Sequence, residues 1–185
     1  MTSALLIIDM QQGMADRIAA GRQPVNPDAM ARMAVLVAHA RRTGMPVIHV
    51  HHDDADPASP FRRGAPGGAP MACAAPVAGE TVLWKQRSSA FAGSGLEAHL
   101  KGAGVDRLIV AGAVAAFCVT STVRAASDLG YQVLLAQDAL LGFDLPAHDG
   151  GRIEAAVVQR VTLSILGADF AQLVTVDQLA GVAVA

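Results

Sequence analysis

The sequence contains little charge, few aromatic residues and only two cysteines in 185 residues. Charged residues make up 16% of the chain and aromatic residues 4%, and the formal net charge is −2. A balance so close to neutral provides no basic surface for nucleic acid or an anionic membrane. We therefore expect neither nucleic acid nor a membrane as a partner.

Several other signals are missing. Cys73 and Cys118 are too few for a disulfide framework or a cysteine-based zinc site. The first residues lack the basic segment of a signal peptide, and the apolar runs are too short to span a bilayer. No G-x-G-x-x-G pattern follows the first apolar run, which disfavours a dinucleotide-binding enzyme. We expect a cytoplasmic protein with reduced thiols and no cofactor.

Apolar residues are what the chain does have, at 52% of the total. The length fits one domain of ordinary size, and we predict a single domain over residues 1–185. So apolar a composition must be buried either in a large core or against other subunits. We therefore predict a homo-oligomer, a dimer or larger.

Apolar runs of strand length alternate along the chain with segments of helical periodicity. The predicted strands are residues 4–8, 47–51, 81–85, 107–111, 132–136 and 173–176. The predicted helices are about residues 27–43, 95–103, 118–129 and 153–166. This alternation predicts an α/β sandwich around a mostly parallel sheet. Residues 53–80, rich in proline and glycine, read as a long loop of the kind that is functional or mobile.

Ligands of such sheets bind beyond the carboxyl ends of the strands, so polar residues that follow strands are the first candidates. Cys118 follows a strand and a turn at a predicted helix start, where the helix dipole favours a thiolate and backbone N–H groups can hold an oxyanion. Asp9 and Lys85 also end predicted strands and suit a general base and a thiolate partner. The alternatives are a buried structural thiol for Cys118, a turn residue for Asp9 and a solvated side chain for Lys85.

Five motifs follow one another in the chain. They are LLIIDMQ at 5–11, KQRSSAF at 85–91, VAGAVAAFCV at 110–119, AASDLGY at 125–131 and QDA at 137–139. In order and separation they resemble the isochorismatase-like cysteine hydrolase family, which includes nicotinamidases and N-carbamoyl amide hydrolases. The resemblance covers about residues 4–176. It implies a three-layer, Rossmann-like sandwich with a mostly parallel central sheet.

The resemblance also implies a mechanism. Asp9 would accept the thiol proton, Lys85 would stabilise the thiolate, and Cys118 would attack a carbonyl carbon to form a thioester. Backbone N–H groups of Ala115 and Cys118 would hold the oxyanion, and a cis peptide is expected between Val114 and Ala115. The implied activity is hydrolysis of a C–N bond in a small amide, carbamoyl or ureido compound.

Some positions depart from the family pattern. Ala115 and Ala116 stand where many relatives carry threonine and a polar residue, and Gln159 stands near a position that is often histidine. Met14 replaces a common phenylalanine, which changes one pocket wall. These departures mean that no particular substrate of the family can be assigned to this chain from the resemblance. Candidate pocket residues are Met14, Phe91, Phe117 and Phe143.

The polar run His51-His52-Asp53-Asp54 invites a metal site, since nicotinamidases bind a metal after the second strand. Neighbouring side chains on a strand point to opposite faces, so we favour a hydrogen-bonded or solvated cluster and expect no metal. Arg62 and Arg63 in the long loop suit a substrate carboxylate, although a solvated pair is the simpler interpretation.

Two alternative functions stay open. An isochorismatase-type vinyl ether hydrolase would not need the cysteine, so the presence of Cys118 argues against it. A non-catalytic binding or redox-sensing protein of the same fold is kept open by the alanines at positions 115 and 116.

Overall fold

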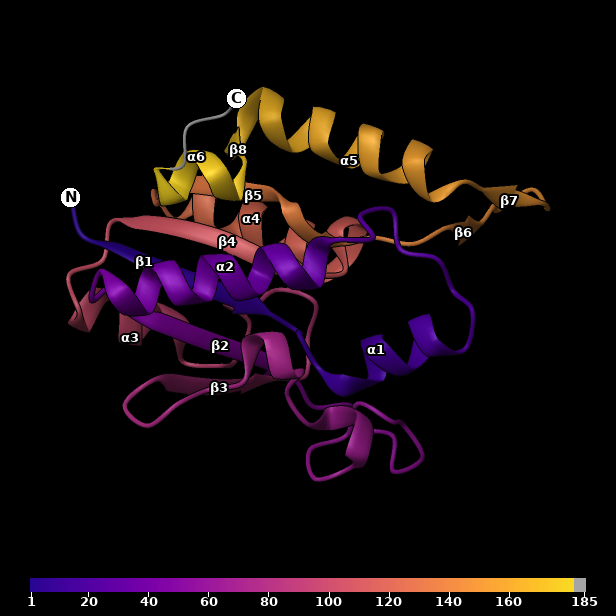
Figure 1. Ribbon diagram of the computed structural model, residues 1–185, viewed down its shortest axis with the longest axis horizontal. Coiled ribbons are helices and arrows are strands. Elements are labelled where there is room, and N and C mark those ends of the chain that lie inside the picture. Colours follow the sequence, from indigo (N-terminus) through magenta and orange to yellow (C-terminus); the bar gives the residue numbers. More distant parts are fainter. Residues whose placement is uncertain (182–185) are drawn as a thin grey trace.

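A six-stranded parallel sheet forms the centre of the computed structural model, which describes residues 1–181 (Figure 1). The strands are β1 (Ser3–Ile8), β2 (Val47–His52), β3 (Thr81–Lys85), β4 (Arg107–Ala113), β5 (Gln132–Leu141) and β8 (Gln172–Val174). Their order is β3-β2-β1-β4-β5-β8, and every neighbouring pair is parallel. The chain therefore winds from β1 to one edge and returns through β4 to the other. Such a reversal, here between β1 and β4, opens a crevice at the carboxyl ends of the strands.

Helices cover both faces of the sheet, so the predicted α/β sandwich is confirmed (Figure 1). One face carries α2 (Ala29–Arg42) and α6 (Val176–Ala180), and the other carries α3 (Leu96–Gly102), α4 (Thr120–Asp128) and α5 (Ala155–Asp169). The helix α1 (Gln12–Ala19) lies beyond the carboxyl end of β1. Smaller elements are the turns η1 (Pro66–Gly68), η2 (Ala72–Ala74) and η3 (Ala115–Val119) and the hairpin of β6 (Leu145–Pro146) and β7 (Arg152–Ile153).

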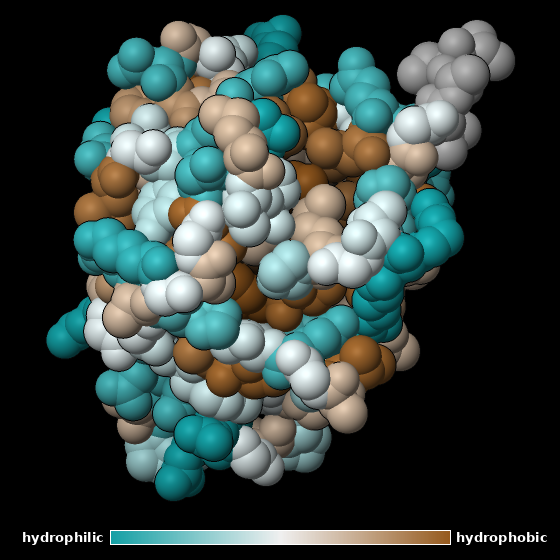
Figure 2. All heavy atoms as spheres, turned by 90° about the vertical axis from the view of Figure 1, so that its left-hand side faces the viewer, coloured by the Kyte–Doolittle hydropathy of each residue, from teal (hydrophilic) through white to brown (hydrophobic). Residues whose placement is uncertain are grey.

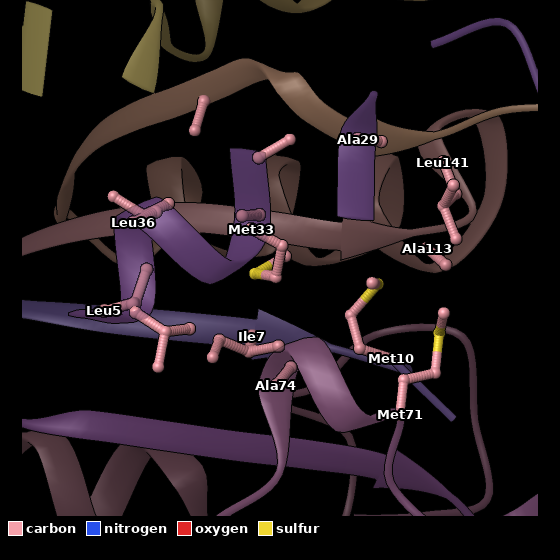
Figure 3. Packing of buried hydrophobic residues seen from close by; sticks show 14 of the residues in the cluster. Leu5, Ile7, Met10, Ala29, Met33, Leu36, Met71, Ala74, Ala113 and Leu141 are labelled. Atoms are coloured by element: carbon pink, nitrogen blue, oxygen red, sulfur yellow. The ribbon is translucent and has the colours of Figure 1, made fainter. Parts of the chain in front are cut away.

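The two core layers follow from the alternation of side chains along β1. Leu5 and Ile7 belong to the cluster under α2, whereas Leu6 and Ile8 belong to the cluster under α3 and α4. Figure 3 shows Leu5 and Ile7 lying toward Leu36 and Met33 of α2. Because β1 is central and buried on both faces, its sequence is a continuous apolar run rather than an alternating one.

The predicted strands are all present, but some boundaries differ. The strand β5 continues to Leu141, five residues beyond the predicted end, and the helix α1 was not predicted. The N-cap of α3 is Gly95, at φ 80°, so this helix begins at Leu96. No helix within residues 1–181 is both long and apolar enough to cross a membrane.

Gly112 allows the closest approach between β4 and β1. It pairs with Ile8 and adopts a φ of +131°, which L side chains rarely adopt. A Cβ at this position would overlap the carbonyl oxygen of Ile8 and lie 2.7 Å from its nitrogen. The turn that follows β4 depends on this contact.

We expect Gly112→Ala to destabilise the protein by about 3 kcal/mol or more, because backbone atoms of a central strand would have to move. Gly102→Ala is the matched control: its Cβ would meet nothing within 4 Å. It should be neutral or stabilising by up to about 1 kcal/mol. Urea unfolding of both variants measures the difference, and equal effects would contradict this account.

Glu80 ties α2 and β2 to the start of β3. Its carboxylate accepts hydrogen bonds from Arg41 at 2.7 and 2.9 Å and from the backbone of Val77 at 3.0 Å, and it lies 2.9 Å from His49 Nε2. The hydrogen bonds from Arg41 lower the pKa of Glu80 to about 2, although burial opposes the shift. The ionised carboxylate is thus part of the folded state.

We expect Glu80→Gln to lower the free energy of unfolding by roughly 2 kcal/mol at pH 7. The folded pKa of Glu80 lies below its ordinary value of 4.5, so its contribution is present above pH 4.5 and is lost as pH falls toward 2. The difference between wild type and variant should therefore shrink over that window in urea unfolding. A difference that stays constant down to pH 2 would show that the carboxylate charge is not involved.

Candidate active site

Three side chains that follow different strands meet at the carboxyl edge of the sheet. The ammonium of Lys85, the last residue of β3, lies 2.8 Å from Asp9 Oδ2 and 3.3 Å from Cys118 Sγ. Asp9 follows β1, and Cys118 lies in η3 after β4. The structure thus brings together the three residues that the sequence analysis selected, although β2 lies between β1 and β3.

Asp9 stands where β1 turns away from the sheet. It is the only non-glycine residue with a positive φ among residues 1–181, at 49°, and it is 2% exposed. Aspartate is one of the few side chains that tolerate this region. Oδ2 accepts from Lys85, whereas Oδ1 is buried without a hydrogen-bond partner among the described residues. One carboxylate oxygen is therefore available to accept a proton.

The pKa values reverse one expectation about Cys118. Burial raises the pKa of the thiol to about 11, the charge of Asp9 adds to this shift, and Lys85 opposes it. The sequence analysis expected a helix start to favour the thiolate, but burial and the nearby carboxylate outweigh that effect. Burial also raises the pKa of Asp9, and Lys85 partly offsets it. The resting pair is a neutral thiol beside a basic carboxylate.

Gln11 holds the strand ends in register around the site. Its side-chain amide donates to the carbonyls of His52 at 2.9 Å and Gly68 at 3.1 Å, and its oxygen accepts from the His52 backbone N–H at 2.8 Å. His52 Nδ1 in turn lies 3.4 Å from Lys85 Nζ. The sequence analysis quoted Gln11 within a motif but assigned it no role. Its position two residues after Asp9 was the available signal.

The turn after β4 carries the cis peptide one residue earlier than predicted. The cis bond joins Ala113 and Val114 rather than Val114 and Ala115, because the strand ends at Ala113 and helical geometry already begins at Ala115. Within residues 1–181, the N–H groups of Ala115 and Cys118 make no backbone hydrogen bond outside this helical segment. Their role as an oxyanion hole stays a prediction.

A cavity of about 310 Å³ opens beside the thiol. It is lined by Met14, Arg17, His52, Asp54, Phe61, Val114, Phe117 and Cys118. Met14 and Phe117 were predicted as pocket residues, and both line it.

The other two predicted pocket residues, Phe91 and Phe143, are not among the residues that line this cavity. Phe91 stacks on Tyr131 at 5.8 Å, and Phe143 is 2% exposed beneath Arg22. Sequence reasoning missed Arg17 and Phe61. Arg17 lies one helical turn after Met14, but α1 itself was not predicted.

Another cavity lies at the opposite edge of the sheet, the face that Figure 2 shows. It has a volume of about 360 Å³, and its lining includes the first residues of β4, β5 and β8, which are Arg107, Gln132 and Gln172. Hydrophobic atoms lie in hollows between polar side chains on this face (Figure 2). Its lining contains no nucleophile, whereas that of the cavity beside the thiol includes Cys118.

The polar run His51-His52-Asp53-Asp54 begins within β2, and its two histidines lie on opposite faces of the sheet. His51 is buried with its ring 5.2 Å from Trp84, whereas His52 approaches Lys85. Asp53 accepts from the Arg63 backbone at 2.8 Å, and Asp54 accepts from the backbone of Asp56. Among the described residues, no group of three or more His, Cys, Asp or Glu side chains could hold a metal ion.

Comparison with known proteins gives one family. A family model, the isochorismatase domain, matches residues 3–165. The isochorismatase family protein YrdC of Bacillus subtilis is 28% identical, over 95% of this chain and 93% of its own length. Maleamate amidohydrolase of Pseudomonas putida is 30% identical, over 74% of this chain and 71% of its own length. A solved isochorismatase-family structure from Chromobacterium violaceum superimposes with a TM-score of 0.92, at 36% identity, over 98% of this chain and 93% of its own.

Asp9→Asn should lower the pKa of Cys118 below the wild-type value of about 11, because the carboxylate charge raises it. Lys85→Met should have the opposite effect and raise the pKa of Cys118 above the wild-type value, because Lys85 opposes the shift. The pH dependence of iodoacetamide alkylation measures both, in a Cys73→Ala background so that only Cys118 reacts. Profiles with identical midpoints in all three proteins would show that the three groups are not electrically coupled.

Proposed function

This chain belongs to the isochorismatase family of hydrolases, and we propose that it is a cysteine-dependent amidohydrolase with Cys118 as its nucleophile. The observation that carries the proposal is the position of Lys85 Nζ, 2.8 Å from Asp9 and 3.3 Å from the Cys118 sulfur. A cavity lies directly beside that sulfur. The substrate class is a small molecule with an amide, carbamoyl or ureido C–N bond.

The first half-reaction forms a thioester. Asp9 Oδ1 takes the thiol proton as Cys118 Sγ bonds to the substrate carbonyl carbon. The carbonyl oxygen becomes an oxyanion, for which the backbone N–H groups of Ala115 and Cys118 are the donors. The C–N bond then breaks as Asp9 returns the proton to the leaving nitrogen. The products of this step are the thioester and ammonia or an amine.

The second half-reaction uses the same groups in reverse. Asp9 takes a proton from water, and the resulting hydroxide attacks the thioester carbonyl carbon. The C–S bond breaks, the sulfur leaves as a thiolate and Asp9 returns the proton to it. Lys85 remains charged throughout. It opposes the high pKa of the thiol, so its attraction grows as negative charge develops on the sulfur.

Two observations support amide chemistry over the alternatives. Maleamate amidohydrolase, by its name, acts on an amide, and it shares 30% of aligned residues with this chain. The cysteine with a lysine and a carboxylate beside it suits acyl transfer, whereas the vinyl ether reaction does not require a thiol. Ala115 and Ala116 remove side-chain hydroxyl contacts but leave the backbone donors in place.

An oligomer stays a prediction, and α5 supports it. Val157, Val161 and Ile165 recur at every fourth position of this helix and are 43%, 50% and 48% exposed. Such a stripe is typical of a surface that another subunit covers.

Ammonia release from a panel of small amides, ureas and carbamoyl compounds tests the function. We expect wild type to hydrolyse at least one compound and Cys118→Ala to lose about a thousand-fold or more in rate. Cys73→Ala is the matched control. Cys73 packs against the core cluster under α2 and does not line the cavity, so its substitution should leave the rate unchanged. Equal release by wild type and Cys118→Ala would exclude Cys118 as the nucleophile.

A further inference from the structure

Arg17 stands in the active-site cavity without an acidic partner. It lines the same cavity as Cys118, with its guanidinium carbon 4.8 Å above the ring of Phe61 and Nη1 3.8 Å from Met14 Sδ. None of the ion pairs among residues 1–181 includes it. The contacts orient the guanidinium through its face and one edge, and they leave this solvent-exposed charge without an ion-pair partner among residues 1–181.

Two other charged residues, Asp9 and Arg22, already form ion pairs of their own. Asp9 pairs with Lys85, and Arg22 pairs with Asp144 at 3.3 Å. Asp54 is the acidic residue in the lining of the cavity, and its Oδ1 accepts a hydrogen bond from the backbone N–H of Asp56 in its own loop. Burial lowers the pKa of Arg17, and the charge of Arg22 adds to this. An anion bound at Arg17 would supply the ion-pair partner that residues 1–181 do not provide.

The rest of the cavity explains what kind of anion fits. Met14, Val114 and Phe117 give it apolar walls, while Cys118 supplies the reacting sulfur. A ligand that fills this space has a short apolar body between a scissile carbonyl and a negative group. Arginine binds carboxylates through parallel N–H donors, which a solvated lysine does not reproduce.

We propose that Arg17 binds a carboxylate of the substrate, so that the enzyme acts on small amide or ureido compounds that also carry a carboxylate. This inference rests on the proposed function for the identity of the bond that is cut, but not for the binding itself. The sequence analysis offered Arg62 and Arg63 for this role. Neither lines the cavity, and Arg63 instead lies 4.9 Å above the ring of Trp84.

Binding to the Cys118→Ser variant tests the inference without turnover. The probes are three matched pairs, malonamate and malonamide, succinamate and succinamide, and glutaramate and glutaramide, which differ only in a carboxylate replaced by a carboxamide. We expect at least one monoamide to bind ten-fold or more tightly than its diamide in NMR titrations. Adding Arg17→Met should abolish the preference and Arg17→Lys should restore part of it. Arg63→Met, the matched control, should preserve it.

The outcomes separate this inference from the proposed function. If no carboxylate binds better than its neutral partner, or if the preference survives Arg17→Met, the inference is wrong. If the preference depends on Arg17 but the wild-type enzyme releases no ammonia from the preferred compound, the inference stands and the proposed function is weakened. If ammonia release depends on Cys118 but not on a carboxylate, the proposed function stands alone.

Discussion

The buried pair of Lys85 and Asp9 is the interaction on which the site depends. Lys85 is 1% exposed and Asp9 2%, so neither charge has water to stabilise it. Removing one partner of such a pair typically costs about 3–5 kcal/mol, because the other charge stays buried alone. The pair also links the ends of β1 and β3 across β2, where Gln11 and His52 complete the contacts. The groups that would carry catalysis are thus part of what holds the carboxyl edge together.

The same burial explains how a thiol with a high pKa can still react. In the resting site burial raises the pKa of Cys118 to about 11, Asp9 adds to the shift and Lys85 opposes it, so little of the thiol is ionised near neutral pH. In the proposed mechanism the proton moves to Asp9, the carboxylate charge disappears and Lys85 faces a thiolate 3.3 Å away. Two unit charges at that separation attract by roughly 5 kcal/mol at an effective dielectric constant of about 20. The same calculation for Lys85 and Asp9 at 2.8 Å gives about 6 kcal/mol, so Lys85 recovers most of the attraction that is lost when Asp9 is protonated.

The sequence predicted those parts of the site that strand ends determine. Asp9 and Lys85 each follow an apolar run, and Cys118 follows a glycine-containing turn, so their edge of the sheet was predictable. Their contact was not, because it depends on β3 lying beside β2 and on a lysine long enough to reach past it. Phe91 and Phe143 were misplaced because an aromatic residue gives no signal that separates a pocket wall from the core. The pKa of Cys118 depends on burial by distant segments, which local pattern does not reveal.

The long segment of residues 53–80 forms part of the wall of the active-site cavity. It enters and leaves at β2 and β3, and it supplies Asp54 and Phe61 to the walls but none of the three reacting side chains. The other walls of the cavity come from α1 and from the turn after β4, whereas the proposed reacting groups Asp9, Lys85 and Cys118 lie at the ends of the sheet strands. Substitutions at Asp54 and Phe61 would therefore alter selectivity without removing a reacting group. Selectivity and reactivity would then be encoded in separate stretches of the chain, so that one could change while the other is kept.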